Sequence, residues 1–278
     1  MAYKDILAPV IALDQDEAAL GIASELAGKF DARGVALIVS VAVGSAFEET
    51  PHALSEILED VGRGARSGAG PAREQIIAWT ERAQASFEVR DVSIEKAVMD
   101  DEILAHARVA DLVVMTRGAP GDRARRAMIE DVLLKSGRPL MLAPQRPLRA
   151  RNWEKIVIGW NATPQAVRAV SAAMPLLQAA KAVTVATVDA RPSAAGHSQA
   201  PGHEIAAHLA RHGVKVEVEN IDGVGRSHGK ALLDEAAAVG ADLLVIGGYG
   251  HSRTEEAVFG GVTRELLAGA PIPLMLAH

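Results

Sequence analysis

Hydrophobic and polar positions follow two patterns that alternate along this chain. Short apolar runs such as residues 4–11 and 154–160 predict buried strands, and residues 214–221 alternate with period two, which is typical of a half-exposed strand. Longer stretches such as 164–180 and 229–240 have the spacing of amphipathic helices. Strands that alternate with helices favour an α/β fold with a doubly wound parallel sheet.

The alternation of strands and helices occurs twice along the chain. PLMLAP at 139–144 returns as PLMLAH at 273–278, and ADLVVM at 110–115 returns as ADLLVI at 241–246. The period is far longer than that of a solenoid, so the repeat indicates a tandem duplication.

The two copies join in a segment rich in proline and arginine, residues 145–152. We therefore predict one doubly wound domain over residues 1–146 and a second over 152–278. The first copy carries an insertion, residues 44–72, whose middle we expect to be helical.

Composition narrows the class of protein. The chain has 278 residues and no cysteine, which excludes disulfides, thiolate metal sites and a cysteine nucleophile. A net charge of −6 argues against general nucleic-acid binding. No apolar run approaches the ~20 residues of a membrane span, and charge comes too early at the N-terminus for a signal peptide. We expect a cytoplasmic protein that binds neither nucleic acid nor membranes.

Glycines gather after the predicted strand 241–246. Gly247 and Gly250 are followed, after nine further residues, by Gly260 and Gly261 at the start of a predicted helix. Glycine lets backbone N–H groups approach an anion, and a helix N-terminus adds unpaired donors and a positive dipole end. The arrangement suits phosphate, although a turn with close helix–strand packing gives the same pattern.

Residues 247–278 resemble the C-terminal part of universal stress protein domains, whose nucleotide signature is G-x2-G-x9-G-[ST]. The resemblance extends over most of 153–278, and the whole chain resembles a tandem universal stress protein. In that family the last strands of two domains pair. The resemblance therefore implies an internal pseudo-dimer in which 139–144 pairs with 273–278.

The resemblance also implies one site for ATP or another adenine nucleotide, with or without Mg²⁺, in the second domain. Asn161, where nucleotide binders carry Asp, would lie at the adenine and ribose end with Val188 and Asp189. Gly261 replaces the Ser or Thr of the signature, which removes a hydroxyl donor. The residues at the phosphate end would be Gly247, Gly250, His251, Gly260, Gly261, Val262 and Thr263, the last with a hydroxyl of its own.

The first copy lacks this site. Ile11 stands in place of Asn161, and Arg126 and Ala127 stand in place of the last two glycines. We expect a nearby arginine group to form a solvated face or a contact surface, with a site for a different anion as the alternative. The group comprises Arg117, Arg123, Arg125 and Arg126.

Other chemical signals are weaker. His208 and His212 have the i, i+4 spacing that zinc sites use, but no obvious carboxylate completes a set, so we expect a solvated helix face. No P-loop lysine is present. We expect no enzyme, or at most weak ATP hydrolysis.

Three functions stay open. The first is a stress-response regulator in which an adenine nucleotide orders the loop 250–260 and changes the surface offered to an unidentified protein partner. The second is an interaction or scaffold protein with a decayed nucleotide site, and the third is a slow ATPase. The sequence leaves open whether whole chains form homodimers.

Overall fold

The computed structural model describes residues 2–41, 69–94, 99–119, 121–146, 152–192, 200–248 and 261–278. The chain divides into two compact units. We name them the N-terminal unit, with the elements from β1 to α5, and the C-terminal unit, with β5 and the elements from β6 to β10. The helix predicted in the middle of segment 44–72 lies outside the described residues.

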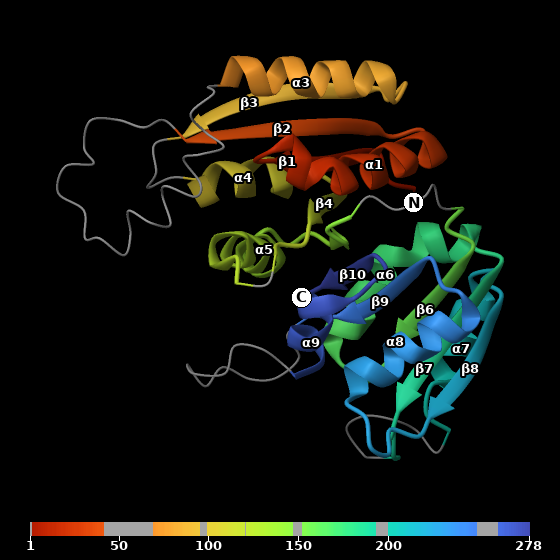
Figure 1. The fold of residues 1–278 in the computed structure, drawn as a ribbon. Coiled ribbons are helices and arrows are strands. Elements are labelled where there is room, and N and C mark those ends of the chain that lie inside the picture. Colours follow the sequence, from red (N-terminus) through yellow and green to blue (C-terminus); the bar gives the residue numbers. More distant parts are fainter. Residues whose placement is uncertain are drawn as a thin grey trace. The chain divides into compact units, whose positions relative to one another are not determined.

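The N-terminal unit is a parallel sheet with helices on both faces (Figure 1). Its strand order is β3-β2-β1-β4, and the pairs β1–β2, β2–β3 and β1–β4 are all parallel. Helix α1 packs with α3, and α4 packs with α5. Its elements are β1 (Asp5–Val10), α1 (Leu13–Phe30), β2 (Arg33–Val41), α3 (Ala69–Arg82), β3 (Phe87–Ile94), α4 (Met99–Arg108), β4 (Leu112–Thr116) and α5 (Arg123–Lys135).

The C-terminal unit repeats this design with the strand order β5-β10-β9-β6-β7-β8. Right-handed crossovers place α6 and α7 on one face of the sheet and α8 and α9 on the other. Its elements are β5 (Leu140–Ala143), β6 (Lys155–Gly159), α6 (Pro164–Ala179), β7 (Ala182–Val188), α7 (His203–Arg211), β8 (Val216–Ile221), α8 (His228–Val239), β9 (Leu243–Gly247), α9 (Gly261–Gly269) and β10 (Leu274–Ala277). The predicted fold class, tandem doubly wound α/β, is confirmed.

The two repeated strands pair with each other. β5 runs antiparallel to β10, with Met141 opposite Met275, whereas the other strand pairs of the C-terminal unit are parallel. All four residues of each strand are buried. The pairing expected for these strands is therefore present.

Local sequence signals account for the element boundaries. The Thr163 side chain caps α6 at Ala166 N–H, and Pro164 occupies the first turn, where its missing N–H costs nothing. Helix α8 ends at Gly240, which has φ of 65° as a left-handed C-terminal residue requires. β8 is the edge strand of its sheet, which explains its half-exposed alternation.

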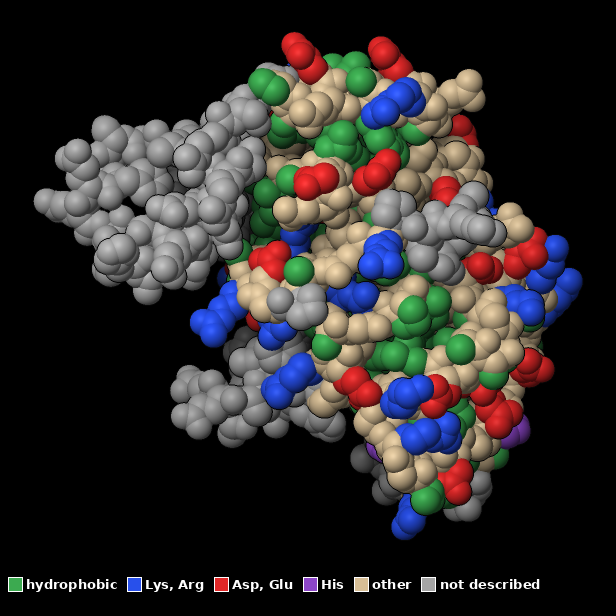
Figure 2. Space-filling view, in the orientation of Figure 1, with side chains coloured by type: hydrophobic (Ala, Val, Ile, Leu, Met, Phe, Trp, Pro, Cys, Tyr) green, Lys and Arg blue, Asp and Glu red, His purple; other side chains and the backbone are tan. Residues whose placement is uncertain are grey.

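The surface carries mixed charge. In the view of Figure 2, Lys and Arg side chains are interspersed with Asp and Glu side chains. None of the helices in the described part of the chain has the length and apolar character needed to cross a membrane.

Candidate functional site

The site is built at the carboxyl edge of the sheet in the C-terminal unit. β6 and β9 are neighbours in the sheet, but the chain leaves them for α6 on one face and α9 on the other. In open α/β sheets, ligands bind in the crevice that forms where the strand order reverses in this way. Asn161 follows the end of β6, Asp189 follows β7, and Gly247 ends β9.

Gly247 brings β9 into direct contact with the N-terminus of α6. A Cβ atom at this position would lie 2.6 Å from the backbone N of Ala166 and 2.9 Å from the carbonyl carbon of Gln165. Backbone atoms cannot move aside as a flexible side chain can, so this approach requires glycine. The predicted phosphate-loop glycine therefore also sets the packing of α6 against the sheet.

Asn161 is held by the cap of α6. Thr163 donates its hydroxyl to Asn161 Oδ1 over 2.8 Å and accepts the N–H of Ala166 over 3.3 Å. Ala162, between them, has φ of 55°, a left-handed conformation unusual for a residue with a Cβ. The Asn161 side chain is thus exposed, and the Thr163 hydroxyl holds its amide oxygen in place.

Asp189 organises the next loop. It has φ of 50°, and its Oδ1 accepts the N–H of Gly223 over 3.0 Å. Its Oδ2 lies 3.4 Å from Nε2 of His228, the first residue of α8. Val188 before it is half-buried at the end of β7.

At the phosphate end, α9 begins at Gly261, and within the described residues no atom lies within 4 Å of a Cβ added there. The first N–H groups of any helix lack partners within the helix. Val262 is half-exposed, whereas Thr263 is only 4% exposed and shares the buried face of α9 with Leu266. The structure places Thr263 on the side of α9 that packs inward. Gly250, His251 and Gly260 lie outside the described residues.

Sequence reasoning missed two side chains of this edge, His228 and Glu265. Ser227 is the N-cap residue of α8, and its partner Glu265 comes 38 residues later. The Ser227 hydroxyl donates to Oε1 of Glu265. No local pattern signals a contact over that separation.

The matching crevice of the N-terminal unit contains a buried ion pair. Arg125 NH1 lies 2.5 Å from Asp16 Oδ1, and the two side chains are 4% and 0% exposed. Oδ2 of Asp16 also accepts the N–H groups of Ile11 and Ala12, at 2.8 and 3.3 Å. The second guanidinium nitrogen, NH2, donates to Asp16 Oδ2 over 3.2 Å and to Gln15 Oε1 over 3.4 Å, so a carboxylate already compensates the charge of Arg125.

Strand register aligns the two crevices. Ile6 pairs with Leu112 as Ile156 pairs with Leu243. Counting from these pairs, Asp16 takes the place of Ala166, Thr116 takes that of Gly247, and Ile11 takes that of Asn161. The close approach at Gly247 therefore has no equivalent in the N-terminal unit.

The expectation that all four arginines form a solvated or contact surface was wrong for Arg125. Burial also lowers the pKa of Arg117. Arg125 packs its aliphatic chain against Gly118, where a Cβ would lie 2.9 Å from Arg125 Cγ. Asp122 caps α5 by accepting the N–H of Arg125 over 2.9 Å. Arg125 is buried because Asp16 compensates its charge, and no local pattern indicates a partner 109 residues away.

His208 and His212 are both exposed on α7 and at its C-terminus, with ring centroids 4.6 Å apart. Within the described residues, no group of three or more potential metal-ligating side chains is present.

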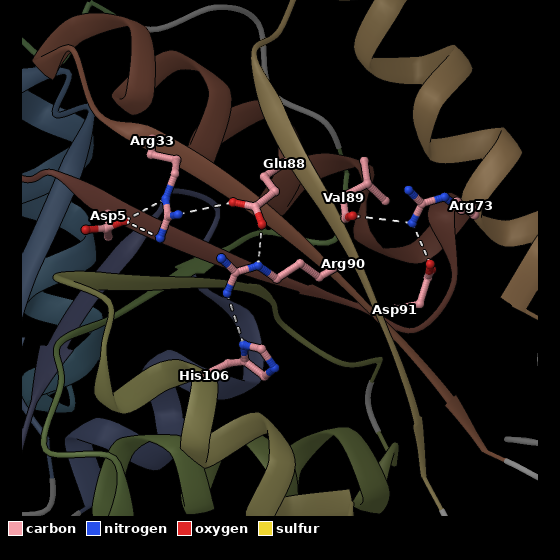
Figure 3. Close-up of polar contacts among 8 residues, drawn as sticks. All are labelled: Asp5, Arg33, Arg73, Glu88, Val89, Arg90, Asp91 and His106. Atoms are coloured by element: carbon pink, nitrogen blue, oxygen red, sulfur yellow. Dashed lines mark hydrogen bonds and ion pairs between the residues drawn. The ribbon is translucent and has the colours of Figure 1, made fainter.

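A second polar cluster lies at the amino ends of the strands in the N-terminal unit (Figure 3). Arg33 pairs with Asp5 over 2.8 Å and with Glu88 over 3.1 Å, and Glu88 accepts from Arg90 over 2.7 Å. The Arg90 hydrogen bond is the main reason that the pKa of Glu88 is lowered. Ligands of doubly wound sheets bind at the opposite, carboxyl ends of the strands. We therefore assign this cluster to pairing of exposed strands.

The fold and the crevice define a class of doubly wound α/β proteins with a glycine-rich strand-to-helix connection. Residues 152–278 match the universal stress protein family. A universal stress protein from Archaeoglobus fulgidus DSM 4304 matches at a TM-score of 0.66 and 16% identity, over 98% of this chain and 97% of that one. A putative universal stress protein from Pseudomonas aeruginosa UCBPP-PA14 matches at a TM-score of 0.57 and 15% identity, over 99% of this chain and 93% of that one. Comparison with curated proteins found no match.

The segment 152–278 thus belongs to the universal stress protein family. In fold, the whole chain is of the tandem, two-domain type of that family.

Proposed function

We propose that the C-terminal unit binds one adenine nucleotide at the β6–β9 crevice and that the protein is a nucleotide-responsive regulator. The observation that carries the proposal is the placement of Asn161, Asp189 and Gly247 at the carboxyl ends of β6, β7 and β9. β6 and β9 flank the switch in strand order, where α/β sheets bind their ligands.

The described residues divide the site into two ends. Asn161 and Asp189 offer polar side chains, and Val188 offers backbone groups, for adenine and ribose. Gly247 and the N-terminus of α9 form the phosphate end, because unpaired N–H groups and a positive dipole end stabilise anions. Family resemblance adds Gly250, His251 and Gly260 to that end.

The residues present fit phosphate better than they fit a catalytic centre. Gly261 is exposed, and no described residue lies within 4 Å of a Cβ added there. Thr263 is turned inward, so backbone groups of Gly261 and Val262 would carry the contact. We therefore propose binding without fast turnover, and with or without Mg²⁺.

The test is calorimetric titration of nucleotide-free protein with ATP, with and without Mg²⁺. We expect a stoichiometry near one, since the N-terminal crevice holds the Asp16–Arg125 pair. Gly261→Asp should abolish binding by like-charge repulsion while keeping the fold, because its side chain has room and an acidic residue suits a helix N-terminus. Gly269→Asn, at the other end of α9, is the control for added side-chain volume, since it brings no negative charge to the helix C-terminus.

Gly261→Ser sharpens the test. It supplies the hydroxyl of the family signature, and a hydrogen bond to a charged group contributes about 1.5–3 kcal/mol, which is roughly a tenfold to hundredfold gain in ATP affinity. Unchanged affinity in both the Asp and the Ser variant would contradict a phosphate site at α9.

The alternative is an interaction or scaffold protein whose nucleotide site has decayed. Asn161 favours it, because an amide brings no negative charge where family binders carry Asp. It predicts no saturable heat with ATP, ADP or AMP at cellular concentrations.

A further inference from the structure

The first turn of α8 lies between two elements that end at the proposed site. On the β7 side, His228 Nε2 is 3.4 Å from Asp189 Oδ2. On the α9 side, the Ser227 hydroxyl donates to Glu265 Oε1, and its oxygen also accepts the N–H of Lys230 as the cap of α8. We name Asp189, Ser227, His228 and Glu265 the α8 bridge.

Glu265 is seated directly on the backbone of α8. A Cβ at Gly229 would collide with Glu265 Oε2 and would lie 2.7 Å from its Cδ. The carboxylate thus occupies the space that glycine leaves open in the first turn of α8. A negative charge is favourable there, because it faces the positive end of the helix dipole.

The α8 bridge contacts α9 through Glu265, which lies outside the buried face of this helix. Thr263 and Leu266 hold the inner face of α9. Glu265 stands one helical turn after Gly261, so its contact with Ser227 and Gly229 restrains the turn next to the proposed phosphate contacts. Without it, the short helix would be held mainly along its buried face.

We propose that Glu265 and Ser227 are positioning residues that hold the N-terminus of α9 in the orientation that nucleotide phosphates require. This inference rests on the proposed function. The direction in which ATP affinity changes on replacing Glu265 distinguishes positioning from simple electrostatics. A carboxylate near a phosphate site repels the ligand, so removing Glu265 would strengthen ATP binding if charge alone mattered. Positioning requires the opposite change.

Two variants weaken the contact in different ways. Glu265→Gln removes the charge and leaves the Ser227 hydroxyl a neutral acceptor, and Gly229→Ala displaces the side chain by steric collision while keeping the charge. Gly229 lies within a helix, where Ala is preferred to Gly, so a general loss of helix stability is not expected. Asp234→Asn is the matched control, because Asp234 pairs with Lys230 and Arg226 on the exposed side of α8 and lies outside the bridge.

The closing experiment titrates these proteins with ATP and with adenosine and follows hydrogen exchange of the α9 amides without ligand. In Glu265→Gln and Gly229→Ala we expect ATP affinity to fall about tenfold, the loss of one hydrogen bond to a charged group. Adenosine affinity should stay unchanged, since adenosine makes no phosphate contact. Exchange over 261–269 should accelerate in both variants and stay at the wild-type rate in Asp234→Asn.

Tighter or unchanged ATP binding in Glu265→Gln would overturn the proposal. Equal losses for ATP and adenosine would also overturn it, because they indicate a general structural defect. If the wild-type protein binds neither ATP nor adenosine, the proposed function is wrong. Hydrogen exchange then tests the α8 bridge by itself, and unchanged exchange of the α9 amides in both variants would refute the claim that the bridge restrains this helix.

Discussion

The buried Asp16–Arg125 pair gives the most direct stability prediction. Arg125→Met keeps the aliphatic stem but removes the guanidinium that lies 2.5 Å from Asp16. Breaking a buried ion pair by removing one partner costs about 3–5 kcal/mol, because the other charge stays buried. Asp16 retains the N–H groups of Ile11 and Ala12. We therefore expect the lower end, about 3 kcal/mol, or roughly two powers of ten in the unfolding equilibrium.

Two assays measure this loss. Urea unfolding gives the free energy, and hydrogen exchange over 13–30 and 123–135 locates it in α1 and α5. Arg126→Met is the control, since Arg126 is the exposed neighbour in the same helix. Replacing both partners with apolar residues should cost less than either single change. If Arg125→Met unfolds like Arg126→Met, the argument that this pair fills and stabilises the N-terminal crevice is wrong.

Two further predictions concern Gly247 and Glu88. Gly247→Ala places a Cβ 2.6 Å from the backbone N of Ala166 and should destabilise the C-terminal unit by about 1–3 kcal/mol in urea unfolding, as overpacking does; Gly269→Ala, with open space, should not. Glu88 has a pKa below its ordinary 4.5, so its contribution is present above that value and is lost as pH falls through the lowered folded-state pKa. Glu88→Gln should therefore reduce stability slightly at neutral pH and not in strong acid, and an equal effect at both pH values would contradict the ion-pair assignment.

The elements were largely predictable because their signals are local. The helix predicted at 164–180 is observed as Pro164–Ala179, with its cap and proline in adjacent positions. The repeat located β5 and β10 as two copies of one apolar strand, and the family resemblance implied that they pair. Residues of the proposed site that follow strand ends, Asn161 and Asp189, were also predictable, because a strand end fixes the edge of the sheet at which a residue lies.

Long-range polar contacts were not predictable in the same way. Arg125 reads as one of several surface arginines until Asp16, 109 residues away, is placed beside it. Glu265 reads as an ordinary helix residue until Ser227 and Gly229 are found beneath it. Both side chains depend on tertiary packing, and neither leaves a periodic pattern in a single sequence.

The two crevices differ in what supplies the charge at the switch point. In the N-terminal unit, Arg125 and Asp16 neutralise each other, so the loop and both helix termini are stabilised without a ligand. In the C-terminal unit, Ala166 stands at the position of Asp16 and brings no charge, and Gly247 stands at the position of Thr116. A bound anion would supply the missing negative charge there, and its binding free energy would stabilise the unit that holds it. Saturating ATP should therefore raise the unfolding midpoint of the C-terminal unit and leave exchange in α1 and α5 unchanged, whereas slower exchange in α1 and α5 would mean that the N-terminal crevice also binds nucleotide.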